Sequence, residues 1–123
     1  MAAESVTTII SELSGLGENR VFTDHFVTTT TPTLGAKNRQ IQASADANEA
    51  LNLCGISTVE LLCITCITND VDIDLDFVSA FDADLTINEG ESAVIPKPAG
   101  VVHIKNNDSS EVSIIDYLII GSA

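Results

Sequence analysis

The second half of the chain repeats one pattern about every ten residues: an apolar or alternating segment followed by a turn-forming segment. From Leu51 onward the segments with strand composition are VELLCITCI, DVDIDLDFV, ADLTIN, ESAVIP, GVVHIK and EVSIIDYLII. No helical periodicity falls between them, and consecutive strands joined by turns pair antiparallel. The sequence therefore predicts a mostly-β protein, an antiparallel β-sandwich or jelly-roll-like barrel of seven to eight strands once the N-terminal part adds one or two.

Length and side-chain composition fit this fold class. A chain of 123 residues suits one domain with a real core. It is 45% hydrophobic and only 4% aromatic, so branched aliphatic side chains, which favour strands, must supply most of the core.

The N-terminal part has a different pattern. In SVTTIISELSG, Val6, Ile9, Ile10 and Leu13 follow helical spacing, which predicts a short amphipathic helix. The following RVFTDHFVTTTTPT is rich in Thr and Val and predicts an extended segment. We therefore expect an N-terminal arm over residues 1–48, a short helix plus an extended segment, and a β-sandwich body over residues 49–123.

The segment DVDIDLDF at residues 70–77 alternates acidic and apolar side chains. On a strand this alternation sends one set into the core and the other outward, which predicts an outward ladder of Asp70, Asp72, Asp74 and Asp76. An EF-hand is excluded because the sixth and twelfth positions hold Leu75 and Phe81 instead of Gly and Glu. A solvated face, a partner contact and a cation site remain open. His103 and Lys105 are expected to face outward and to offset the acidic charge.

Three cysteines, Cys54, Cys63 and Cys66, cannot all pair within one chain. An offset of three places Cys63 and Cys66 on opposite faces of a strand, which disfavours a redox pair or a four-ligand zinc site. We expect free thiols that serve as packing residues, and no cofactor.

The net charge of −13 disfavours binding to nucleic acid or to an anionic membrane. The chain has no G-x-S-x-G, phosphate-binding loop or dinucleotide fingerprint, and Asp24 and His25 are adjacent, so they point to opposite faces of a strand. The sequence does not predict an enzyme. No signal peptide or long apolar span is evident.

Two strand segments, LLCITCI and VSIIDYLII, are apolar on both faces. A strand in a two-layer sandwich needs only one apolar face, so the second is expected to lie under the N-terminal helix or against another subunit. We expect a homo-oligomer, with a trimer among the candidate states. The apolar interface residues predicted from these strands are Leu62, Ile64, Ile115, Tyr117 and Ile119.

Residues 50–123 resemble the small β-sandwich virion proteins of tailed bacteriophages. The resemblance rests on the run LNLCGISTVELLCITC, on the alternating DVDIDLDF, on LTINEGESAVIPKPAGVVHIKNN and on the closing SSEVSIIDYLIIGSA. The shared parts are a Gly-Ile-Ser-Thr turn at 55–58, an Asn-rich turn after the strand at 102–106, and an apolar last strand closed by Gly121. Cys54 departs from the pattern, which has a small residue such as Gly at this position.

The resemblance implies a non-enzymatic structural protein of the virion, assembled in the host cytoplasm, and first of all a capsid decoration or cement protein that stabilises the phage head. The arm, with Arg20, Lys37 and Arg39, would then contact other virion proteins such as the major capsid protein. A neck, tail or fibre-base component is an alternative. A second alternative is a cellular β-sandwich that binds a divalent cation or ligand through its Asp-rich face.

Overall fold

The computed structural model describes residues 3–27, 31–43, 47–108 and 110–123, and these residues form ten strands and no helix. The strands are β1 (Val6–Leu13), β2 (Arg20–Val27), β3 (Leu34–Gln42), β4 (Glu49–Ala50), β5 (Thr58–Thr68), β6 (Val71–Phe77), β7 (Leu85–Ile87), β8 (Ser92–Ile95), β9 (Val101–Asn106) and β10 (Ser113–Ser122). All pairings are antiparallel. The predicted mostly-β antiparallel class is confirmed.

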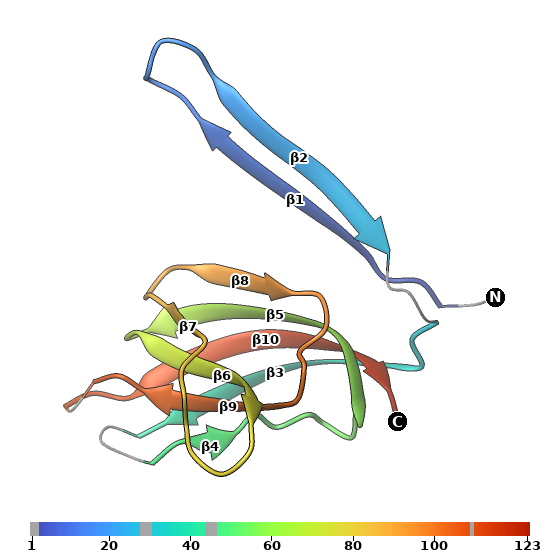
Figure 1. The fold of residues 1–123 in the computed structure, drawn as a ribbon, viewed down its shortest axis with the longest axis vertical. Helices are drawn as coiled ribbons and strands as arrows, with labels where there is room; N and C mark the ends of the chain where they lie inside the picture. The colour runs from blue at the N-terminus through green and yellow to red at the C-terminus, as the bar shows by residue number, and fades with distance from the viewer. Residues whose placement is uncertain (1–2, 28–30, 44–46, 109) are drawn as a thin grey trace.

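Eight of the strands form a two-layered body, and the other two form a separate hairpin. One sheet has the order β3-β10-β5-β8 and the other the order β4-β9-β6-β7. The β1-β2 hairpin is a third, two-stranded sheet that projects away from the body (Figure 1).

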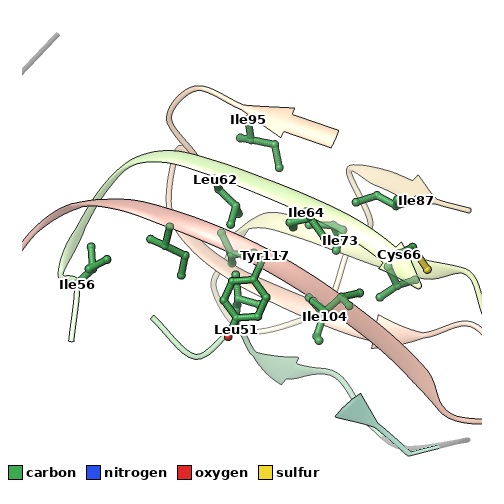
Figure 2. Close-up of a cluster of buried hydrophobic side chains, with 14 residues drawn as sticks. Leu51, Ile56, Leu62, Ile64, Cys66, Ile73, Ile87, Ile95, Ile104 and Tyr117 are labelled. Atoms are coloured by element: carbon green, nitrogen blue, oxygen red, sulfur yellow. The ribbon is translucent and has the colours of Figure 1, made fainter. Parts of the chain in front are cut away.

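The core lies between the two four-stranded sheets. Leu62, Ile64 and Ile115 come from one sheet, and Ile73 and Ile104 come from the other. Figure 2 shows Leu62, Ile64, Ile73 and Ile104 in one cluster, with Tyr117 as its aromatic member. Complete burial of a Leu or Ile side chain contributes about 1.5–3 kcal/mol, so this aliphatic layer is the main source of stability.

The predicted N-terminal helix is wrong, because residues 6–13 form strand β1. Residues 6–10 are Val, Thr, Thr, Ile and Ile, and a run of five β-branched residues favours a strand over a helix. The next strand has a similar composition, and Gly15 and Gly17 take positive φ angles of 94° and 101° in the connection that reverses the chain. The N-terminal segment is therefore half of a hairpin, and the expected seven to eight strands become ten.

Strand β3 lies within the segment predicted to be the arm, yet it is the edge strand of a body sheet. It pairs with β10 along its whole length, from Ser113 opposite Gln42 to Gly121 opposite Leu34. The Arg39 guanidinium and the Asp116 carboxylate reinforce this pairing with contacts of 2.6 and 2.9 Å. Only residues before β3 leave the body.

Candidate functional site

The β1-β2 hairpin exposes an unusual amount of apolar surface. Seven of the fourteen large hydrophobic side chains that are exposed in the described residues belong to it or its turn, so half of this surface comes from one short segment. The seven are Val6, Ile10, Leu13, Leu16, Val21, Phe22 and Val27. The extensive contacts of β1 are with β2, and those of β2 are with β1. The body covers neither face of the hairpin (Figure 1).

The register divides the hairpin into two faces of different character. Thr7 lies opposite Phe26 and Ser11 lies opposite Phe22, so both phenylalanines of the hairpin share one face. We call this the aromatic face; its members are Thr7, Ile9, Ser11, Leu13, Arg20, Phe22, Asp24 and Phe26. The whole chain has only four Phe residues, and aromatic side chains are typical anchors of protein interfaces.

The outer face of the β3-β10-β5-β8 sheet carries an open hollow of about 490 Å³. Its lining includes Lys37, Arg39, Cys63, Thr65, Asp116 and Leu118. Two cross-strand rows run through it. The first row consists of Arg39, Asp116, Thr65 and Ser92. Its polar groups pair within the row: Arg39 forms an ion pair with Asp116, and the Thr65 and Ser92 hydroxyl groups share a 2.8 Å hydrogen bond.

The second row consists of Lys37, Leu118, Cys63 and Val94, one residue from each strand of the sheet. We call it the Lys37 row. Lys37 makes no ion pair with any residue that the structure describes. An apolar row with a free cation at its edge has the composition of a contact surface.

The structure separates the residues predicted to form an interface. Lys37 and Arg39 lie together on β3, whereas Arg20 lies at the far end of the hairpin in an exposed ion pair with Glu18 at 3.3 Å. The predicted apolar interface residues are all in the core, namely Leu62, Ile64, Ile115, Tyr117 and Ile119. Their assignment to a subunit contact is therefore corrected. The second apolar face of these strands is formed by alternate residues such as Leu118.

The predicted Asp ladder is wrong at one position. Asp70 and Asp76 are exposed and Asp72 is half-buried, but Asp74 is only 2% exposed. Ile73 and Leu75 pack on the core side, so Asp74 keeps the outward side of β6 opposite His103, and the chain that follows β6 covers it. It accepts backbone hydrogen bonds of 3.0 Å from the N–H groups of Asp76 and Asp82.

Asp74, Asp76 and Asp84 form a cluster in which one carboxylate oxygen from each lies within 4.8 Å of the others. The backbone hydrogen bond from Asp82 lowers the pKa of Asp74, and His103 opposite it on β9 acts in the same direction. The pKa of Asp76 is raised, first because its carboxyl group hydrogen-bonds to Asp74 and then because Asp84 carries a like charge. As the pH falls, Asp76 therefore takes up a proton before Asp74 does.

His103 and Lys105 lie where the sequence predicted, facing the acidic side chains of β6. Asp74 pairs with His103 and Asp72 pairs with Lys105. The imidazole also stacks on Phe77 with a centroid distance of 3.6 Å, and its Nδ1 lies 2.7 Å from Asn48 Oδ1. These contacts make His103 a structural side chain, half-buried and held by its ring face and its Nδ1.

The cysteines lie in three different environments. Cys66 is buried in the core, Cys63 is half-buried on the opposite face, and Cys54 is exposed. The predicted placement of Cys63 and Cys66 on opposite faces of a strand is confirmed. Burial raises the pKa of both thiols, which disfavours the reactive thiolate.

Comparison of the chain with protein-family models, with curated proteins and with solved structures finds no match. Within the part of the chain that the structure describes, there is no helix long and apolar enough to cross a membrane.

The sequence analysis missed the aromatic face of the hairpin and the Lys37 row. A signal for the first was present, because VTTIISEL and RVFTDHFV are two β-rich segments separated by a Gly-rich turn. No signal marked the second, since its four residues come from four strands whose order follows only from the fold.

Proposed function

We propose that this chain is a non-enzymatic structural protein of a virus particle, a capsid decoration or cement protein that joins neighbouring subunits. The observation that carries the proposal is the uncovered β1-β2 hairpin. A two-stranded hairpin is at best marginally stable alone in water, and this one has apolar residues on both faces. Such an element gains stability when another protein surface covers it.

The body has the properties of a rigid platform for the hairpin. Its aliphatic core is continuous between the sheets, and Tyr117 fixes the edge strand by accepting a 2.9 Å hydrogen bond from Asn38 Nδ2 and donating one of 2.9 Å to the Asn52 carbonyl. The resemblance of residues 50–123 to phage virion sandwiches supports the proposal that this platform belongs to a particle. A neck, tail or fibre-base position would use the same two parts and is the second candidate.

The cation-binding alternative is less well supported. Asp74, the buried member of the acidic cluster, already accepts a backbone hydrogen bond on each of its two carboxylate oxygens. These hydrogen bonds engage the oxygen atoms that a cation would need. Thermal stabilisation by millimolar Ca²⁺ would favour this alternative over the assembly role.

Co-sedimentation of the full chain with undecorated capsids tests the proposal. We expect the wild type to sediment with the particles and a Phe22→Asp variant to bind at least tenfold more weakly, because a charge on the aromatic face opposes its burial. A Val78→Asp variant is the matched control, since Val78 is 88% exposed and lies outside the hairpin. A wild type that stays in the supernatant at every concentration would refute the capsid role.

A further inference from the structure

The aromatic face of the hairpin needs a cover, and the body it belongs to does not supply one. The Thr33 N–H donates a 2.9 Å hydrogen bond to the Gly121 carbonyl, and Pro32 is buried, so the chain is fixed where it enters β3. From this base the hairpin extends away from its own sheets (Figure 1). A surface on another molecule is therefore the natural cover.

Charge selects among the surfaces that could receive the hairpin. Residues 4–25 include four acids, Glu4, Glu12, Glu18 and Asp24, against the single base Arg20. The outer face of the β4-β9-β6-β7 sheet bears Asp72 and the acidic cluster, which outnumber Lys105 there and repel such a hairpin. On the outer face of the other sheet, Asp116 neutralises Arg39, and Lys37 makes no ion pair with any described residue. This second face therefore complements an acidic hairpin better than the first does.

The receiving face also fits in shape and polarity. The Lys37 row crosses the hollow, with the half-buried side chains of Leu118 and Cys63 along its middle and Val94 at the far edge. Such a hollow can take an aromatic side chain, and a buried Phe removes about 150–250 Å² from water. On the hairpin, Asp24 lies between the two phenylalanines along β2, where a carboxylate can meet a lysine at the edge of the row.

We propose that the occupant is a second copy of this chain: the aromatic face of one hairpin lies on the Lys37 row of the next copy. Each copy then gives one hairpin and receives one. This contact pairs two different surfaces, so it gives a reciprocal dimer or a ring where the geometry closes, and an open filament where it does not. The inference rests on the assembly role proposed above, and it assigns the hairpin to contacts between copies.

Light scattering of full-length variants, mixed in pairs, tests the inference. The hairpin variant is Phe22→Asp, and the row variant is Lys37→Glu with Val94→Asp. We expect the wild type to have the mass of two or more copies of the 13.0 kDa chain, and each variant alone to have the mass of one copy. An equimolar mixture should form a dimer, because one intact hairpin and one intact row remain.

A variant with Lys105→Glu and Val78→Asp is the matched control. It makes the same charge changes as the row variant, but Lys105 belongs to the acidic face. We expect it to keep the wild-type mass. Circular dichroism melting of every variant checks that the body is folded, so that loss of association is not mistaken for unfolding.

Three results would overturn the inference. They are a wild type that is monomeric at about 100 μM, a row variant that keeps the wild-type mass, and a mixture of the two variants that stays monomeric. A monomeric wild type that still sediments with capsids would overturn this inference and leave the capsid role intact. An oligomeric wild type that does not sediment with capsids would overturn the capsid role and leave this inference intact.

Discussion

At the residue scale, the two carboxyl groups of Asp74 and Asp76 act on stability in opposite directions. The pKa of Asp74 is lowered by its backbone hydrogen bonds, so its contribution is present above its unfolded pKa and is lost as the pH falls through its folded pKa. The pKa of Asp76 is raised, so its contribution is present at low pH and is lost as the pH rises through its folded pKa. At neutral pH, ionised Asp76 opposes folding.

Replacing Asp76 with Asn should therefore raise the Tm at pH 7, because the amide removes the like charge beside Asp74 and Asp84. The gain should shrink as the pH falls through the raised folded pKa of Asp76, and it should be gone below about 4, the ordinary range of an Asp carboxyl group. Asp74→Asn should lower the Tm at pH 7, since one oxygen that accepts a backbone hydrogen bond is lost. Thermal melts from pH 3 to 8 measure both variants, and an Asp76→Asn variant less stable than wild type at pH 7 would contradict this account.

Gly121 is required for a different physical reason. A Cβ at this position would overlap the Thr58 carbonyl oxygen and lie 2.9 Å from the Ile56 side chain, at a register shift between β10 and β5. Gly121→Ala should lower the free energy of unfolding by about 3 kcal/mol or more, the upper range for overpacking. Gly35→Ala is the control, because only the Ile119 carbonyl lies within 4 Å, at 3.9 Å. Equal urea midpoints for the two variants would argue against the close approach.

The thiols report on burial one residue at a time. Cys54 is exposed, whereas burial raises the pKa values of Cys63 and Cys66. We expect maleimide to label Cys54 first, Cys63 more slowly, and Cys66 only on unfolding. Mass spectrometry of timed samples measures the order of labelling. Early labelling of Cys66 would contradict the burial of its side chain in the core.

At the scale of elements, the sequence predicted strands best where the two faces of a strand differ. β6 and β9 alternate apolar and polar side chains, and both were predicted with the correct faces, although the chain after β6 buries Asp74. β1 was predicted as a helix because four apolar residues at helical spacing outweighed its β-branched composition. On a hairpin that no core covers, apolar spacing carries no information about burial, so local propensity was the better guide.

The hydrogen bonds of Tyr117 join elements that are far apart in the chain. Its hydroxyl group connects β10 to Asn38 on β3 and to the Asn52 carbonyl before β5. Tyr117→Phe should cost about 1–2 kcal/mol, because the carbonyl and the Asn38 amide lose a partner while the ring stays packed. Chemical denaturation measures the change. A Tyr117→Phe variant as stable as the wild type, beside a strongly destabilised Tyr117→Leu variant, would mean that packing of the ring, and not the hydroxyl group, dominates.

At the scale of the whole molecule, charge is divided between the two outer faces of the body. The acidic cluster and Asp72 mark one face, while Lys37 and the paired Arg39 mark the other. The sequence located the acidic segment but could not place Lys37 opposite it, because sheet order depends on pairings between distant strands. Two copies of a chain with a net charge of −13 repel at long range, so this local difference decides which faces can meet.

The boundary between arm and body gives the last prediction. The sequence placed it at residue 48, but β3 pairs along β10 and supplies Arg39 to Asp116 and Asn38 to Tyr117. A chain that begins at Thr31 keeps this strand and the Thr33 hydrogen bond to Gly121, and it loses a hairpin whose strands contact mainly each other. We expect it to melt cooperatively, within a few degrees of the full chain.

A chain that begins at Glu49 should fail to melt cooperatively, because removal of β3 exposes a full edge of β10 and leaves the Tyr117 hydroxyl group without Asn38. Circular dichroism melts of the two truncations, side by side, decide where the body begins. If both fold alike, β3 belongs to the arm. If neither folds, the hairpin supports the body even though its strands pair only with each other, and contact between copies is then part of folding itself.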